Sequence, residues 1–114
     1  MGIFFNVKII TSPVKTSKIA RSKKLTYDIL KDHICVPNTF CKDDSIVYPV
    51  FIKPDRGAGA VDSYMINNSI ELDKKLTQNH IICEYLPGKE YTVECLTDKH
   101  GKLLCSITRE RTIV

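Results

Sequence analysis

The most informative stretch of this chain is Tyr48-Pro-Val-Phe-Ile-Lys-Pro-Asp-Arg-Gly-Ala-Gly-Ala60. It predicts a buried strand that ends in Lys53 and Pro54, followed by a loop with glycine at alternate positions. Glycine lets a backbone approach a ligand closely, loop amides can donate to phosphate oxygens, and the lysine ammonium supplies positive charge. The stretch therefore predicts a polyphosphate site, and a plain flexible hairpin loop is the alternative.

A second stretch, about thirty residues further on, has a complementary character. It reads Ile81-Ile-Cys-Glu-Tyr-Leu-Pro-Gly-Lys-Glu-Tyr-Thr-Val-Glu94, which predicts a strand, a turn at Pro87 and Gly88, and a second, acidic strand. Backbone groups near such a turn suit a base, and a carboxylate suits ribose hydroxyls because it offers two acceptor oxygens. The two stretches together predict a nucleotide site. The alternative for each acid is an exposed strand residue paired with a neighbouring lysine.

The order of these features separates the chain from two common phosphate-binding motifs. No G-x-x-x-x-G-K-[ST] occurs, and the candidate for G-x-G-x-x-G fails after Gly57 and Gly59. Lysine first, glycine loop second and acidic hinge third resembles the ATP-grasp superfamily. Within it the sequence is most similar to the branch that contains the carbamoyl-phosphate synthase large chain. That likeness is carried by Glu84-Tyr85-Leu86, Gly88 and Glu90-Tyr-Thr-Val-Glu94, and upstream by Ser22-Lys-Lys-Leu-Thr-Tyr-Asp-Ile-Leu30 and Ile34-Cys-Val-Pro-Asn-Thr39.

The resemblance implies ATP as the ligand and a contact for each of several residues. Lys53 contacts phosphate and base, and Glu90 accepts from the ribose hydroxyls. The helix-borne basic residue falls at Lys24, with the adjacent Lys23 as the other possible register. The phosphate loop consists of Gly57, Ala58, Gly59 and Ala60, and the adenine hinge consists of Glu84, Tyr85 and Leu86. No residue of this chain is assigned as catalytic or as a metal ligand.

Sequence periodicity predicts an α+β fold. Strands are expected over residues 3–10, 46–53, 63–66, 80–86, 90–97 and 102–111, helices over 22–33 and after Asn68, and a loop over 11–18. Asn68 and Glu71 predict a capping box at the second helix. The resemblance divides the chain into an amino-terminal strand and linker (1–20), the central ATP-grasp lid subdomain (21–87) and the start of the carboxy-terminal subdomain (88–114). The lid is an antiparallel sheet with packed helices, and the last part is a hairpin.

The resemblance implies that the parent protein is a carboxylate–amine or carboxylate–thiol ligase acting through an acyl phosphate. Its partners would be ATP, Mg²⁺ and a small carboxylate, and this chain would be an inactive fragment of it. Two positions depart from the family pattern, because Ala60 stands where serine is usual and Asp62 where glycine is usual. They favour an alternative, a non-catalytic nucleotide-binding or regulatory module with a degenerate phosphate loop. A small basic interaction domain is the third interpretation.

Composition limits the cellular setting. The chain has 114 residues, an ordinary share of apolar residues and a formal net charge of +4. Five scattered cysteines, no signal peptide and no membrane-length apolar run predict a cytoplasmic protein with reduced thiols, most of them in the core. The basic amino-terminal part has no nucleic-acid motif, so neither nucleic acid nor membrane is expected as a partner. The oligomeric state is left open.

Overall fold

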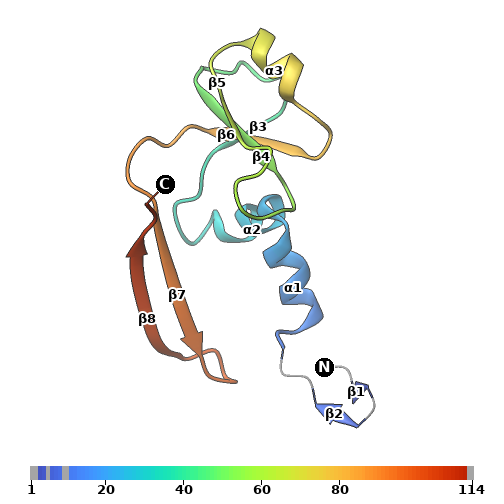
Figure 1. Ribbon diagram of the computed structural model, residues 1–114, viewed down its shortest axis with the longest axis vertical. Coiled ribbons are helices and arrows are strands. Elements are labelled where there is room, and N and C mark those ends of the chain that lie inside the picture. Colours follow the sequence, from blue (N-terminus) through green and yellow to red (C-terminus); the bar gives the residue numbers. More distant parts are fainter. Residues whose placement is uncertain (1–2, 5, 9–10, 113–114) are drawn as a thin grey trace.

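The computed structural model describes residues 3–4, 6–8 and 11–112. The elements in chain order are β1 (Ile3–Phe4), β2 (Val7–Lys8), α1 (Val14–Arg21), α2 (Lys23–Leu30), β3 (Thr39–Phe40), β4 (Val50–Pro54), β5 (Tyr64–Ile66), α3 (Ser69–Lys75), β6 (His80–Glu84), β7 (Tyr91–Thr97) and β8 (Leu103–Glu110). Figure 1 shows a central sheet that carries α3 on one side, with α1 and α2 leading away from it and the β7–β8 hairpin projecting separately.

The central sheet has four strands in the order β3-β6-β4-β5. Each neighbouring pair is antiparallel, and β4 and β6 pair over their whole length, from Val50 opposite Glu84 to Pro54 opposite His80. The predicted α+β fold with an antiparallel sheet is therefore confirmed. The strand expected over 46–53 begins only at Val50 and runs one residue further, to Pro54.

One face of this sheet holds the core. Strand alternation places Val50 and Ile52 of β4 on the same face, and Ile66 and Ile82 lie opposite them on β5 and β6. The side chains of Val50, Ile52, Ile66, Leu72 and Ile82 form one buried cluster, and Leu72 belongs to α3. The helix α3 therefore covers this face, and the core lies between α3 and the sheet.

The two helices predicted from sequence both begin with a side-chain cap. Asn68 caps α3 by accepting a hydrogen bond from the backbone N–H of Glu71. Glu71 reaches back as a capping box predicts, but it accepts from the N–H of Asn67 (2.9 Å), one residue earlier than the cap. Ser22 caps α2 by accepting from the N–H of Leu25. The helix expected over 22–33 ends earlier, at Leu30.

The loop prediction over 11–18 is wrong, because α1 occupies Val14–Arg21. Pro13 suggests a break in the chain, but a proline is also well tolerated at the start of a helix, where its missing N–H costs no intrahelical bond. Lys18 and Arg21 in the last turn interact favourably with the helix dipole. Among the described residues, no helix combines the length and apolar character that crossing a bilayer requires.

The single strand predicted over 3–10 is also wrong within the described residues. Two short antiparallel strands, β1 and β2, replace it, and the chain turns between them at Asn6. Asn6 has a φ of 58°, in the left-handed region that asparagine tolerates better than most residues. Residues 5, 9 and 10 of the predicted strand lie outside the described residues. The proposed division into three parts stays a prediction.

The β7–β8 hairpin has no covering layer within the described chain. Its strands pair from Tyr91 opposite Glu110 to Thr97 opposite Leu103, yet nearly every residue of both strands is exposed. The expectation that most cysteines are core residues is wrong. Cys95 and Cys105 lie on the hairpin, Cys35 and Cys41 lie in exposed connections, and of the five free cysteines only Cys83 is buried.

Candidate nucleotide-binding site

The face of the central sheet opposite the core carries the candidate lysine. Alternation along β4 directs Phe51 and Lys53 away from Val50 and Ile52. The register places Phe51 opposite Cys83 and Lys53 opposite Ile81. Phe51, Lys53 and Ile81 are each half-buried. We call this the open face; it is a partly apolar surface with a cation set into it, which suits a ligand that is both aromatic and anionic.

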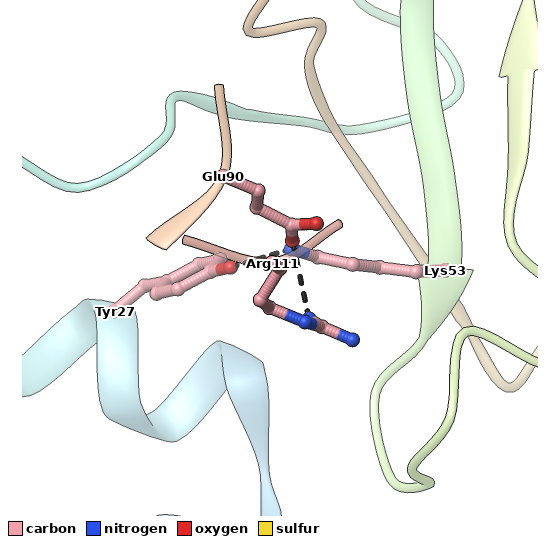
Figure 2. A network of polar contacts seen from close by, with 4 residues as sticks. All are labelled: Tyr27, Lys53, Glu90 and Arg111. Atoms are coloured by element: carbon pink, nitrogen blue, oxygen red, sulfur yellow. Dashed lines mark hydrogen bonds and ion pairs between the residues drawn. The ribbon is translucent and has the colours of Figure 1, made fainter. Parts of the chain in front are cut away.

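Lys53 contacts helix α2 through a neutral group. Its ammonium donates to the hydroxyl of Tyr27 at 2.7 Å and lies 5.3 Å from the centre of the same ring (Figure 2). None of the ion pairs among the described residues includes Lys53. Because a phenol hydroxyl is uncharged, the positive charge of Lys53 is not neutralised by this contact. That charge is available to an anionic ligand.

Cys83 lies beside this lysine but is not a nucleophile at neutral pH. Burial raises the pKa of the Cys83 thiol above its ordinary value of 9.0, the positive charge of Lys53 opposes that shift, and Glu84 adds to it. The thiol also donates to the backbone carbonyl of Phe51 at 3.3 Å. A protonated, hydrogen-bonded thiol is a poor nucleophile, since the thiolate is the reactive form. Cys83 therefore contributes packing to the open face.

The predicted adenine hinge follows directly from β6. Glu84 is the last residue of that strand, its N–H donates to the carbonyl of Asn38 (2.9 Å), and its carboxylate accepts from the Asn38 side chain (2.6 Å). Tyr85 and Leu86 are exposed, and their backbone groups bond to no residue that the structure describes. Free backbone donors and acceptors are what a hinge needs to bind a base. The Glu84 carboxylate, in contrast, is engaged with Asn38.

Glu90 lies where the chain enters the hairpin. Its carboxylate pairs with Arg111 at 3.3 Å, and its backbone carbonyl accepts from the N–H of Arg111 at 2.7 Å (Figure 2). The arrangement matches the plainer alternative raised from the sequence, an exposed acid with a cationic neighbour, although that neighbour is an arginine rather than a lysine. An exposed ion pair contributes only ~0.2–1 kcal/mol, so ribose hydroxyls could replace it at little cost.

The phosphate loop has an unusual backbone. Gly57 and Gly59 have φ of 147° and 76°, and two residues with side chains, Ala60 and Asp62, have φ of 56° and 53°. The left-handed region costs an ordinary residue about 1–2 kcal/mol, while aspartate tolerates it through local hydrogen bonding. The glycine that the family pattern has at the position of Asp62 therefore meets a conformational requirement. The chain retains that conformation without the glycine.

Hydrogen bonds position both ends of this loop. At its end, the His80 side chain contacts the backbone carbonyl of Asp62 through Nε2 (2.8 Å), while Nδ1 accepts from the N–H of Thr77 (3.1 Å). At its start, the Lys23 ammonium donates to the backbone carbonyl of Pro54 (2.7 Å). The sequence left open whether Lys23 or Lys24 is the basic residue that contacts the nucleotide. Of these two, Lys23 is bonded to the protein. The side chain of Lys24 is exposed.

A large open cavity of about 1590 Å³ lies beside the loop and contains part of the predicted set. Its walls include Lys24, Gly57 and Ala58 together with Arg56 and Asp62. The remaining predicted residues, which are Lys53, Gly59, Ala60, Glu84, Tyr85, Leu86 and Glu90, are not among its walls. The structure thus brings Lys24 to the phosphate loop.

Comparison with known proteins identifies the family. The model of the ATP-grasp domain matches residues 20–114 of this chain. The chain belongs to the ATP-grasp family. The matched part begins within α1 and runs through the sheet, the loop and the hairpin, so every predicted site residue of this ATP-grasp domain lies inside it. The predicted superfamily is confirmed.

Curated relatives of this ATP-grasp domain include several ligases. It is 26% identical to the D-alanine–D-alanine ligases of Thermotoga petrophila and Thermotoga maritima over 109 aligned positions, which cover 86% of this chain and 36% of each relative. It is 27% identical to the D-alanine–D-alanine ligase of Petrotoga mobilis over 95 positions, which cover 75% of this chain and 32% of the relative. The chain spans about one third of the length of these curated relatives.

The described residues of this ATP-grasp domain do not fit a metal site. Phosphoryl transfer from ATP generally uses magnesium to offset charge on the phosphates. A magnesium site in protein requires carboxylate oxygens that converge. Among the residues that the structure describes, no group of three or more His, Cys, Asp or Glu side chains could hold a metal ion. We therefore assign no step of the proposed reaction to a metal ion held by these residues.

Sequence reasoning missed Tyr27 and Asp55. Tyr27 holds the ammonium of Lys53, and Asp55 accepts hydrogen bonds from Ser22 and from the backbone of Lys24. The N-cap of α2 is Ser22 and not Asp55, so no local capping pattern in the sequence marks Asp55. Its partner lies 33 positions away in sequence, so only the fold could identify it.

Proposed function

We propose that this chain supplies ATP-binding parts of an ATP-dependent ligase that joins a carboxylate to an amine or a thiol. In the proposed reaction a carboxylate oxygen attacks the γ-phosphorus of ATP, and ADP departs with the bonding electrons. The nucleophile then attacks the acyl carbon, and inorganic phosphate leaves. The observation that carries the proposal is Lys53, a half-buried cation on the open face whose nearest polar contact is a neutral hydroxyl.

All of the predicted residues except Glu84 have a role in the proposal. Lys53 supplies charge to the phosphates, and the amides of the phosphate loop donate to their oxygens. The backbone of Tyr85 and Leu86 binds the base, and Glu90 exchanges Arg111 for the ribose hydroxyls. Lys24, exposed beside the loop, adds a second cation. These residues bind and orient ATP, and their contribution to the rate comes through positioning and charge.

Two observations support a proposal for the substrate class. The names of the curated relatives describe ligases of D-alanine to D-alanine, so an amino-acid carboxylate and an amine are the first pair to test. The segments Glu84–Leu86 and Glu90–Glu94 resemble the carbamoyl-phosphate synthase large chain, and we retain that narrower relationship as a proposal. We also propose a cytoplasmic location, which the five free cysteines fit.

A second candidate is a nucleotide-binding or regulatory module without ligase activity. Asp62 favours it, because this acid lies in the wall of the same cavity as Gly57 and Ala58. A negative charge near a triphosphate is repelled, and the effect is larger where water is partly excluded. Both candidates predict ATP binding, and only the first predicts phosphate release by the whole protein in the presence of an amino-acid substrate.

Calorimetric titration of ATP into the chain tests the proposal. We expect a dissociation constant between high micromolar and millimolar, or roughly 4–6 kcal/mol of binding. Lys53→Ala should remove ~1.5–3 kcal/mol of this, since the bond to phosphate is charge-assisted. Lys99→Ala is the matched control, because Lys99 is exposed in the turn of the hairpin.

Three results would contradict the proposal. Equal affinities for Lys53→Ala and Lys99→Ala, with circular dichroism showing that both variants fold, would remove Lys53 from the site. Absence of ATP binding by the wild-type chain at millimolar concentration would favour the third interpretation, a basic interaction domain. Binding in the nanomolar range would show that the site is far more complete than proposed.

A further inference from the structure

Asp55 joins three segments that are distant in sequence. It follows β4 directly, and its backbone N–H donates to the carbonyl of Asn79 at 2.8 Å. Its carboxylate oxygens lie 3.0 and 2.9 Å from the hydroxyl of Ser22, and one of them accepts from the N–H of Lys24 at 2.8 Å. Asp55 thus satisfies a backbone donor in the first turn of α2, which would otherwise have no partner inside the helix.

Ser22 extends this connection into the helix. Its side chain is almost completely buried, with 2% of the residue surface exposed, and its hydroxyl oxygen accepts from the N–H of Leu25 at 3.1 Å. A hydroxyl can donate one hydrogen bond and accept another. Ser22 therefore donates to Asp55 while it caps α2, so the position of the loop and the start of the helix depend on each other.

Lys23 also connects α2 to the phosphate loop, through both its backbone and its ammonium. Its backbone N–H donates to the carbonyl of Asp55 at 3.1 Å. Its ammonium lies 2.7 Å from the carbonyl oxygen of Pro54, 3.3 Å from that of Asp55 and 3.4 Å from that of Gly57. One ammonium with three hydrogens can serve three acceptors. Lys23 consequently turns several carbonyls at the start of the phosphate loop toward α2.

The orientation of these carbonyls determines the orientation of the loop amides. In a planar trans peptide the C=O and the following N–H point in opposite directions. Because the carbonyls of Asp55 and Gly57 face Lys23, the N–H groups of Arg56 and Ala58 point away from it. Arg56, Gly57 and Ala58 all lie in the wall of the open cavity. The N–H groups of Arg56 and Ala58 donate to no residue that the structure describes, so they can donate to an anion.

We propose that Ser22, Lys23 and Asp55 form a latch that positions the phosphate loop for ATP. The latch, defined as these three residues, holds the amides of Arg56 and Ala58 away from Lys23 and fixes them relative to the exposed Lys24. The three are positioning residues that act through the loop. The inference rests on the proposed function, because it states how the loop is prepared for the phosphates.

The direction of the change in ATP affinity in Asp55→Ala distinguishes positioning of the loop from charge repulsion by Asp55. Asp55 is an acid beside a loop that is proposed to bind a polyanion. If charge alone mattered, removing it in Asp55→Ala would reduce repulsion and strengthen ATP binding. The latch predicts the reverse, a loss of about tenfold in affinity, which corresponds to ~1.4 kcal/mol. Asp55→Asn retains an oxygen that can accept from Lys24, so it should bind ATP better than Asp55→Ala does.

A matched control and a second variant complete the set. Asp98 also accepts from two backbone N–H groups, those of His100 and Lys102, but it lies in the hairpin turn. Asp98→Ala should therefore leave ATP affinity unchanged. Lys23→Met removes the ammonium and keeps an unbranched side chain of similar length, and it should also weaken ATP binding. If Asp55→Ala fails to fold, the ATP affinity of Lys23→Met tests the latch in its place.

Amide hydrogen exchange measures the latch without nucleotide. In Asp55→Ala the amides of Lys24 and Leu25 should exchange about tenfold faster than in the wild type, because the first loses its acceptor and the second loses an ordered cap. The amide of Leu104 serves as an internal reference in β8. Unchanged exchange at Lys24 and Leu25 would show that Asp55 does not hold the helix.

The exchange and binding measurements together distinguish failure of the latch from failure of the proposed function. Faster exchange combined with unchanged or tighter ATP binding in Asp55→Ala would reduce the latch to a structural cap and overturn the proposal. If the wild-type chain binds no ATP, the proposed function fails, and the positioning role fails with it. The exchange data would then still show whether the latch exists. Weaker ATP binding in both Asp55→Ala and Lys23→Met, with partial recovery in Asp55→Asn, supports the proposal.

Discussion

The strands of the four-stranded sheet and of the β7–β8 hairpin are both predicted from the sequence, but only the sheet has a buried face. In the sheet, Ile52 and Ile66 are completely buried because α3 lies over them. In the hairpin, Val93 and Leu96 occupy opposite faces and are 55% and 58% exposed. The local sequence therefore predicts a strand, whereas burial of one face requires a second layer. The described chain provides such a layer for the sheet alone.

The two regions also use charge differently. The hairpin carries three ion pairs, Lys89 with Glu110, Arg109 with Glu94 and Arg111 with Glu90, and all six side chains are at least 45% exposed. In the sheet, Lys53 is half-buried and has a neutral partner. Paired charges at an exposed surface are already compensated, while Lys53 retains an uncompensated charge. The sheet is therefore the region from which we expect the stronger contribution to anion binding.

The largest expected effect is on stability. Ile52→Ala should lower the free energy of unfolding by about 2–5 kcal/mol, because it leaves a cavity in a fully buried position. Leu96→Ala in the hairpin is the control, and it should cost less than ~1 kcal/mol since its side chain is mostly exposed. Urea unfolding followed by circular dichroism measures both. Similar losses would show that the hairpin is covered in solution.

Cysteine reactivity should distinguish the regions by at least tenfold. Cys83 is buried with a raised pKa, and Cys95 and Cys105 are exposed on the hairpin. Iodoacetamide at pH 8 should therefore alkylate both hairpin cysteines at least about ten times faster than Cys83, because they are accessible and burial keeps the Cys83 thiol protonated. Mass spectrometry of timed digests measures the rates. Equal rates at all three thiols would contradict the described burial.

The raised pKa of Cys83 also predicts a pH dependence of stability. A group whose pKa is higher in the folded state contributes stability that is fully present below its ordinary pKa of 9.0. That contribution is lost as the pH rises through the folded-state pKa, because the unfolded chain ionises first. Stability should fall above about pH 9 in the wild type and less steeply in Cys83→Ala. If the stability of the wild type and of Cys83→Ala falls equally with pH, burial of Cys83 is not the cause of the fall.

The smallest expected effect is at a hairpin ion pair. Glu94→Gln keeps the size of the side chain and removes its charge, so the bond to Arg109 at 2.9 Å becomes a neutral one. The free energy of unfolding should change by no more than ~0.5 kcal/mol, because both side chains are exposed. A loss above ~2 kcal/mol would mean that this pair is desolvated in solution by a layer that the described chain lacks.

The parts of the fold that were predictable from sequence are those determined by local chemistry. The cap at Asn68, the turn before β7 and the strand that carries Lys53 each depend on a few neighbouring residues. The helix α1 was missed because Pro13 is compatible with both a loop and a helix start. The exposure of the cysteines was misjudged because burial depends on layers that the sequence pattern does not specify.

The candidate site likewise has parts that the local sequence predicts and parts that depend on the fold. Lys53 was predictable because a lysine in an apolar strand must reach solvent or a polar group. Its contact with Tyr27 was not, since that residue lies on a different element 26 positions away. The roles of Lys23 and Lys24 could not be separated until the loop carbonyls were placed beside Lys23. Contacts between segments distant in sequence therefore account for what was missed.

The central claim is that the open face, the phosphate loop and the hinge bind ATP together. Amide chemical-shift mapping during titration of isotope-labelled protein with ATP tests it most directly. We predict concentration-dependent shifts at Lys53, Ala58, Tyr85 and Glu90, and none at Lys99 and His100 in the hairpin turn. Shifts that are absent from Lys53 and Ala58, or that appear equally across the exposed lysines, would contradict the claim and indicate non-specific anion binding.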